Sequence, residues 1–278
     1  MTDSRRFDFS SVPALRVGVV PYLNVQPLVY GLEQLAPQLA LIRATPAELG
    51  RMFCAGRIDI GIAPVFASFL ASDRGILPAP SIASDSEVLS VILAANEPLE
   101  RLRVVWRDPN SMTSNALAAV LNARKWGGRI EFADSPPRCR LGPEGLRPGE
   151  GRLLIGDPAL RWRSRYAHIV DLAREWKDWT GLPFVFAAWV GRIGCDFRGL
   201  PSLLEASYRR NAARLPEAAA AYVELPELDM EARVRYLREN IRFEFGAEEK
   251  RAIERFHAEC AGFGLIPVDS AVRWLDDR

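Results

Sequence analysis

Short apolar runs alternate with amphipathic stretches along the first two thirds of the chain. The clearest runs are predicted to be strands, at residues 15–20, 39–43, 59–65, 88–95, 102–108, 129–134 and 182–192. Two further segments, "RLLIGDPAL" and "HIVDLAREWKDWTG", each read as a strand followed by a helix. Apolar runs of this length, separated by helical segments, favour mostly parallel sheets with helices on their faces.

Two of the helices between these strands have clear start and stop signals. Thr45 can cap a helix that has Pro46 at its first position and Glu48 in the first turn. This capping-box arrangement satisfies two backbone N–H groups that otherwise lack partners, and Gly56 can stop the helix. The stretch 114–126, "SNALAAVLNARKW", predicts an amphipathic helix that ends at two glycines.

The character of the sequence changes after residue 199. Stretches 202–224, 229–240 and 246–264 are rich in Ala, Leu, Glu and Arg and are predicted to be helices. An amphipathic helix cannot bury its apolar stripe by itself. We therefore expect this helical tail to pack on one of the earlier α/β units.

Two α/β units and a helical tail predict a two-lobed α/β protein, with mixed sheets flanked by helices and a ligand cleft between the lobes. The long apolar strands at 88–95 and 182–192 stand where the chain would pass from one lobe to the other and return. We expect the first lobe to contain residues 1–93 and 190–278, including the helical tail. The second lobe would contain residues 94–189.

Composition and charge narrow the class of partner. The 278 residues include 36 Lys and Arg against 35 Asp and Glu, so no nucleic acid or anionic membrane is expected as a partner. No apolar run of about 18 residues predicts a membrane span. The N-terminal stretch "MTDSRRFDFSSVPALRV" lacks the apolar core of a secretion signal. We therefore expect a cytoplasmic protein that acts on a small molecule, and the sequence does not indicate its oligomeric state.

The cysteines and histidines predict no metal site. Cys54, Cys139, Cys195 and Cys260 are scattered without CxxC spacing, and the chain has only two histidines. This pattern is typical of reduced thiols in a cytoplasmic protein rather than of a metal-ligand set.

Polar residues gather in four loops that follow predicted strands. They are Tyr22 and Asn24 in the first loop, Ser84 and Ser86 in the second, Ser111, Thr113, Ser114 and Asn115 in the third, and Asp157 in the fourth. In open α/β sheets, ligands bind beyond the carboxyl ends of the strands. These residues are therefore candidates for a binding site.

The third loop has the clearest binding chemistry. It directly precedes a predicted helix, whose N-terminus presents unpaired N–H groups and the positive end of the helix dipole. Several hydroxyl groups around such an N-terminus can bind a carboxylate without Arg or Lys. The alternative is that one Ser or Thr only caps the helix while the others are solvated.

The remaining candidates also have structural alternatives. Asn24 lies between Pro21 and Pro27, and it suits either a turn or a cap of the following helix. Tyr22 can cover the core with its ring while its hydroxyl reaches water. Asp157 can be an N-cap, with a proline at the first helical position.

Five motifs in a fixed order resemble a known family. "VGVVPYLNVQPL", "RIDIGIAPV", "DPNSMTSNAL", "LLIGDPAL" and "EWKDWTGLPFVFAAW" occur within residues 15–265. Together they resemble the chorismate dehydratases of the futalosine route to menaquinone. The resemblance implies a fold like that of the type II periplasmic solute-binding proteins, without metal or organic cofactor. It also implies that chorismate is dehydrated to 3-[(1-carboxyvinyl)oxy]benzoate.

The chemistry of that reaction assigns expected roles to the candidates. Loss of the hydrogen on the ether-bearing ring carbon moves charge into the ring carboxylate, and the neighbouring hydroxyl then leaves as the ring becomes aromatic. Donors that stabilise the developing charge would therefore accelerate the reaction. We expect Ser111, Thr113, Ser114 and nearby N–H groups to hold one carboxylate, with Ser86 assisting. Glu87 should point away, because it would repel a dianion.

The base of the reaction stays open at the level of sequence. No motif contains a His, Lys or Glu in a clearly suitable place. One hypothesis is that the substrate's own enolpyruvyl carboxylate removes the proton while Asn24 holds that carboxylate or the leaving hydroxyl. Pro21 and Pro27 would then stiffen the loop that presents Tyr22 and Asn24. Asp157 is the rival base.

Two other functions are compatible with the same architecture. A 1,4-dihydroxy-6-naphthoate synthase of the same pathway is one, although its sequences lack a YLN-type opening. A non-catalytic protein that binds small anions is the other. The lack of a signal sequence disfavours a periplasmic receptor, and the lack of a DNA-binding segment disfavours a regulator.

Overall fold

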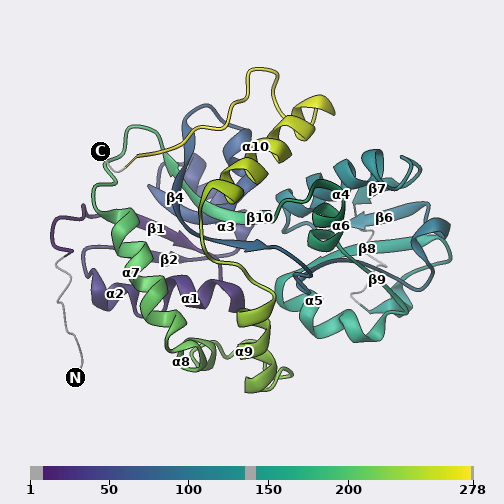
Figure 1. The fold of residues 1–278 in the computed structure, drawn as a ribbon, viewed down its shortest axis with the longest axis horizontal. Coiled ribbons are helices and arrows are strands. Elements are labelled where there is room, and N and C mark those ends of the chain that lie inside the picture. The colour runs from purple at the N-terminus through teal and green to yellow at the C-terminus, as the bar shows by residue number, and fades with distance from the viewer. Residues whose placement is uncertain (1–8, 135–141, 277–278) are drawn as a thin grey trace.

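The computed structural model of the protein contains two sheets that lie side by side, each flanked by helices (Figure 1). The structure describes residues 9–134 and 142–276. Cys139 and the start of the N-terminal stretch considered above lie outside these residues. Within them, no helix has the length and apolarity that a membrane crossing requires.

The first sheet has the strand order β2-β1-β3-β10-β4. Its strands are β1 (Arg16–Val19), β2 (Ala40–Arg43), β3 (Ile60–Pro64), β4 (Arg74–Ser84) and β10 (Phe184–Arg192). β1 pairs in parallel with β2 and β3, whereas β10 is antiparallel to β3 and β4. The last long strand therefore returns to the sheet in which the chain began.

The second sheet has the strand order β7-β6-β8-β5-β9. Its strands are β5 (Val91–Ala95), β6 (Val104–Arg107), β7 (Glu131–Asp134), β8 (Glu150–Ile155) and β9 (His168–Asp171). β6 is parallel to β7 and β8, whereas β5 is antiparallel to β8 and β9. The expected α/β fold with two mixed sheets is confirmed.

The sheets also locate the two points where the chain crosses between lobes. All of β5 belongs to the second sheet and all of β10 to the first. The crossings therefore fall at residues 85–90 and 181–183, before the boundaries expected at 93 and 190. The division into two lobes stays a proposal, with its boundaries moved to these connections so that no strand is cut.

The helices cover the faces of both sheets. They are α1 (Gln26–Val29), α2 (Leu32–Leu35), α3 (Pro46–Cys54), α4 (Met112–Arg124), α5 (Gly156–Trp162), α6 (Leu172–Thr180), α7 (Leu200–Ala212), α8 (Leu215–Ala220), α9 (Met230–Glu239) and α10 (Ala247–Gly262). The capping box expected at Thr45 is present in α3. The helix predicted over 202–224 is instead two helices, α7 and α8. Pro216 has no N–H to continue a preceding helix and lies in the first turn of α8.

The helical tail packs mainly on the first sheet, as Figure 1 shows. Buried polar groups fix α7 on α1: the Ser207 hydroxyl donates to the Leu28 carbonyl at 3.1 Å, and Asn211 Nδ2 donates to the Tyr30 carbonyl at 2.8 Å. α10 also reaches α4, so the tail contacts both lobes. Trp176 of α6, Phe184 of β10 and Phe256 of α10 form an edge-to-face cluster across the second crossing.

Candidate functional site

Polar residues from both lobes line one cleft between the two sheets. The first lobe contributes Tyr22 and Asn24 after β1, and the other polar lining residues are Ser90, Asn110, Ser111, Thr113 and Ser114. Apolar walls come from Val20, Ile62, Ile82 and Phe186. The space between them is about 570 Å³, including the part open to solvent.

The N-terminus of α4 forms one wall of the cleft. Ser111 is the N-cap, and its Oγ accepts a hydrogen bond from the Ser114 N–H at 3.2 Å. Thr113 Oγ1 accepts from the Phe66 N–H of the first lobe at 3.2 Å, which leaves the threonine hydroxyl proton for another acceptor. Ser111 therefore caps the helix, and Ser111, Thr113 and Ser114 also line the cleft.

Asn115 is turned to its own loop and is not among the cleft residues. Its side chain pairs with both backbone groups of Asp108, accepting at 3.2 Å and donating at 2.8 Å. The buried Asp108 carboxylate accepts from the N–H groups of Asn110 and Ile155, and burial raises its pKa. Asn115 and Asp108 therefore hold the loop that presents the α4 hydroxyl groups.

Asn24 lies in a 3-10 turn, Leu23–Val25, directly before α1. Its side chain hydrogen-bonds the hydroxyl of Tyr236, a buried residue of α9. Its Oδ1 is buried, and no group in the described part of the chain donates to it. A buried acceptor without a donor is unfavourable, which makes this oxygen a candidate acceptor for a ligand hydroxyl.

Ser90 and Tyr236 were missed by the sequence analysis. Ser90 precedes β5 and lines the cleft, and its Oγ accepts from the Tyr236 hydroxyl at 2.8 Å. Burial raises the pKa of Tyr236, so this hydroxyl stays protonated and donates. The sequence indicated Ser90 only as a serine inside an apolar run. It gave no signal for Tyr236, which lies in a helix far along the chain.

A strained turn presents Ser90 at the first crossing. Leu89 has φ 60°, and no other non-glycine residue in the described ranges has positive φ. The Ser90 N–H donates to the Val88 carbonyl at 2.7 Å across this turn. The carboxylate of Asp171 accepts from the Val88 and Leu89 N–H groups at 3.1 and 2.8 Å. Asp171 therefore stabilises a conformation that costs an ordinary residue about 1–2 kcal/mol.

Tyr22 lies against Gly156, the first residue of α5. Gly156 has φ +59°, and a Cβ at this position would lie 3.3 Å from two carbons of the Tyr22 ring. Burial, with Asp108 and Asp157 nearby, raises the pKa of Tyr22 to about 12. Tyr22 is therefore a neutral donor whose ring is seated on a glycine of the opposite lobe.

Asp157 is buried and is not among the residues that line the cleft. Its carboxylate accepts hydrogen bonds from the Tyr222 hydroxyl and the Leu23 N–H, and burial raises its pKa. The N-cap alternative is wrong, because Ile155 occupies the N-cap and Asp157 lies inside α5. Asp157 thus joins the second lobe to the loop that carries Asn24.

The second strand-exit loop contributes Ser90 to the cleft and not Ser86. Ser86 is exposed and absent from the cleft lining, and its carbonyl accepts from the Ser84 hydroxyl at 3.2 Å. Glu87 is also exposed and outside the cleft, as expected for a carboxylate that would repel an anion.

The cleft is chemically neutral. Its described lining residues include no Lys, Arg, His, Asp or Glu. No group of three or more His, Cys, Asp or Glu in the described ranges is arranged to hold a metal ion. The cleft can therefore supply hydrogen bonds and a helix N-terminus, but no charged acid or base.

The sequence matches a known protein family over most of its length. The family profile for menaquinone biosynthesis matches residues 15–262. The chain belongs to this family.

Two curated relatives named chorismate dehydratase are similar to this chain over most of their own length. A chorismate dehydratase of Campylobacter jejuni is 26% identical over 257 residues, which are 89% of this chain and 98% of the relative. A chorismate dehydratase of Thermus thermophilus is 30% identical over 227 residues, 74% of this chain and 80% of the relative.

Solved structures show the fold. A protein of Archaeoglobus fulgidus superposes with a TM-score of 0.72 at 15% identity, covering 91% of this chain and 98% of that one. The periplasmic aliphatic sulphonate binding protein of Escherichia coli superposes with a TM-score of 0.64 at 16% identity, covering 92% and 94%. The fold is therefore that of the periplasmic binding proteins.

Proposed function

We propose that this protein is a chorismate dehydratase, a hydro-lyase that converts chorismate to 3-[(1-carboxyvinyl)oxy]benzoate and water. The observation that carries the proposal is the neutral cleft, in which Asn24 and the hydroxyl groups of α4 face one another without any charged side chain. Membership of the menaquinone biosynthesis family and the similarity to two chorismate dehydratases support the same reaction.

The α4 N-terminus is suited to hold one carboxylate of the substrate. Ser111, Thr113 and Ser114 surround the free N–H groups of the first turn, where the helix dipole favours an anion. Each charge-assisted hydrogen bond contributes about 1.5–3 kcal/mol. If the ring carboxylate binds here, its hydrogen bonds to these donors become stronger as the negative charge of the dienolate develops. Interactions that strengthen toward the transition state lower the barrier.

The reaction needs one proton transfer and one leaving group. The C–H bond at the ether-bearing ring carbon breaks, and the electron pair moves through the ring double bond into the ring carboxylate. The C–O bond of the neighbouring hydroxyl then breaks, and the ring becomes aromatic. The hydroxide takes up the proton that was removed, so one water leaves.

We propose that the substrate's enolpyruvyl carboxylate removes and returns this proton. The described cleft lining offers no ionised base, and Asp157 is already occupied by Tyr222 and the Leu23 N–H. The lack of a donor to Asn24 Oδ1 supports a role in which this oxygen accepts from the leaving hydroxyl. An amide orients such a group without changing the protonation state of a neighbouring carboxylate.

The reaction is tested by incubating the purified protein with chorismate and following the products by mass spectrometry and ultraviolet absorption. We expect an aromatic product lighter than chorismate by one water, at a rate proportional to protein concentration. A protein-free control corrects for spontaneous breakdown. Chorismate binding without product would instead support an anion-binding protein, and no binding would reject the substrate.

The role of Asn24 is tested with Asn24→Ala and Asn24→Asp. We expect turnover to fall by about 100-fold or more in both, since the first removes the amide and the second adds a charge that repels the dianion. Asn240→Ala is the control, because Asn240 binds the Glu87 carbonyl at 2.9 Å outside the cleft. Near-normal turnover in both Asn24 variants would remove Asn24 from the mechanism.

A further inference from the structure

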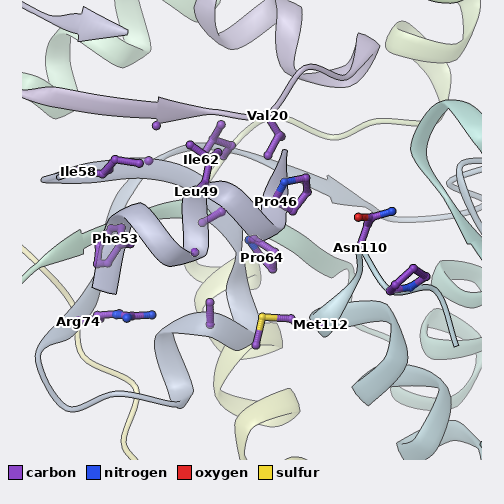
Figure 2. Close-up of a pocket in the computed structure, with 16 residues that line it drawn as sticks. Val20, Pro46, Leu49, Phe53, Ile58, Ile62, Pro64, Arg74, Asn110 and Met112 are labelled. Atoms are coloured by element: carbon purple, nitrogen blue, oxygen red, sulfur yellow. The ribbon is translucent and has the colours of Figure 1, made fainter. Parts of the chain in front are cut away.

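A second pocket adjoins the cleft on the first lobe (Figure 2). It lies between α3 and the strands β1 and β3, and Pro109, Asn110 and Met112 of the second lobe close one side. Its space is about 840 Å³, including the part open to solvent. We call it the side pocket. It shares part of its wall with the cleft, namely Val20, Pro46, Ile62, Ala63, Pro64 and Asn110.

The side pocket is lined mainly by apolar residues. Gly18 and Gly61 are partners in neighbouring strands of its lining, and the Ile58 and Leu49 side chains cover Gly18, since a Cβ there would lie 3.1 and 3.3 Å from them. Phe53, Pro46 and Pro64 contribute rings to the same lining, as Figure 2 shows. An apolar lining that contains rings favours the burial of an aromatic ring.

One cation, Arg74, belongs to the lining. Its side chain is 14% exposed, and its guanidinium carbon lies 4.7 Å from the centre of the Phe53 ring. One terminal nitrogen donates to Cys54 Sγ at 3.1 Å. Nε is buried and makes no hydrogen bond, and the nearby Asp73 carboxylate, exposed to solvent, lies 3.7 Å away. A buried donor without an acceptor is unfavourable.

We propose that the side pocket binds an aromatic monocarboxylate, with its ring against Phe53, Pro46 and Pro64 and its carboxylate accepting from Arg74. An aromatic ring matches the apolar lining, and a single carboxylate matches the single cation. A dianion such as chorismate would leave its second charge without a partner in this lining. The two neighbouring sites thus differ in chemistry: the cleft is neutral and polar, and the side pocket is apolar with one positive charge.

An occupied side pocket would affect the cleft through their common wall. Pro46, Pro64 and Asn110 contact both spaces, so a bound ring restricts the approach of the two lobes at this point. We therefore expect aromatic carboxylates to inhibit the enzyme. This second step rests on the proposed function, whereas binding itself does not.

Binding is tested with 2-naphthoate, which is fluorescent, and with 2-naphthol as the uncharged analogue. We expect saturable binding of 2-naphthoate and at least tenfold weaker binding of 2-naphthol. Arg74→Gln should weaken 2-naphthoate binding by about tenfold and leave 2-naphthol unaffected, since one charge-assisted hydrogen bond is lost. Arg51→Gln, which removes a charge from an exposed position of α3, is the matched control and should change neither.

A second pair of variants fills the pocket without damaging the fold. Gly50 lines the pocket, and a Cβ built on it meets no atom within 4 Å. Gly50→Leu should therefore weaken 2-naphthoate binding by tenfold or more while raising the melting temperature, because leucine is the better helix former. Gly50→Ala gains the same helix preference with little bulk and should bind nearly as wild type.

The outcomes separate this proposal from its alternatives. If Asn24→Ala weakens 2-naphthoate binding and Arg74→Gln does not, the probe occupies the cleft and the proposal is wrong. The absence of saturable binding up to millimolar probe would also reject it. If 2-naphthoate binds as expected but chorismate is not dehydrated, the side pocket stands and the proposed function fails.

Discussion

The Tyr236 hydroxyl donates to Ser90 Oγ at 2.8 Å and also contacts the Asn24 side chain. Tyr236 comes from α9 in the helical tail, whereas Ser90 opens the first strand of the second sheet. One buried hydroxyl thus fixes two polar groups that the chain brings to the cleft from opposite lobes. The helical tail therefore contributes to the site as well as covering the first sheet.

Tyr236→Phe should lower kcat by about tenfold with a smaller change in KM. The ring still fills its place, but Ser90 and Asn24 lose the group that orients them, and a lost hydrogen bond costs about 1 kcal/mol. Steady-state kinetics with chorismate measures this. Tyr208→Phe is the control, because the Tyr208 hydroxyl binds Glu244 at 2.9 Å in an exposed region. Equal losses in both variants would indicate a general effect on the fold.

Asp157→Asn distinguishes a base from a structural link. An asparagine can still accept from Tyr222 or the Leu23 N–H, so we expect turnover to fall by less than about tenfold. The pH–rate profile should keep its shape, since no titrating base is removed. A loss of several orders of magnitude with a normal melting temperature would restore Asp157 as the catalytic base.

The same variant predicts a pH dependence of stability. Burial raises the pKa of Asp157 in the folded chain above its ordinary value of about 3.9. The folded state therefore binds this proton more tightly than the unfolded chain does, so the carboxyl makes the fold less stable as pH rises from about 4 through its folded pKa. The free energy of unfolding of wild type minus that of Asp157→Asn should fall across this window and be constant above it. Urea unfolding at a series of pH values measures the difference.

Leu89 offers a test of strain at the first crossing. Leu89→Ala and Leu89→Gly remove the same packing, but only glycine adopts φ 60° without strain. We expect Leu89→Gly to be more stable than Leu89→Ala by about 1 kcal/mol and yet to have the lower kcat, because the turn that presents Ser90 becomes flexible. If stability and kcat change in the same direction, the turn does not position Ser90.

Gly156→Ala should displace the Tyr22 ring. The new methyl group would lie 3.3 Å from that ring and also force a non-glycine residue into φ +59°. Gly181→Ala has a similar φ of +71° with no atom within 4 Å of the new carbon, so it measures the backbone strain alone. We expect both to lose about 1 kcal/mol of stability and only Gly156→Ala to raise KM. An equal KM in both would show that Tyr22 does not contact the substrate.

Local patterns were sufficient to predict the class of fold and most of the elements, but they missed the long strand β4 (Arg74–Ser84). The capping box at Thr45 and the helix begun by Ser111 depend only on residues within one turn, and both are present. The helix predicted at 202–224 is instead divided before Pro216, because proline has no N–H with which to continue a preceding helix. The first strand-exit loop follows β1 of the first sheet and the third follows β6 of the second sheet, and the two loops meet in the cleft between the sheets.

The sequence by itself determined which residues could form strands, helices and polar loops, because these depend on neighbours a few positions apart. Only the tertiary structure decided which polar side chains face the cleft. In the folded chain, Asn115 bonds the backbone of Asp108, and Asp157 bonds the hydroxyl of Tyr222. Ser86 is exposed, whereas Ser90 lines the cleft. The tertiary structure also brought Tyr236 to Ser90 from 146 positions along the chain. Such choices depend on contacts between segments distant in sequence, for which no local periodicity exists.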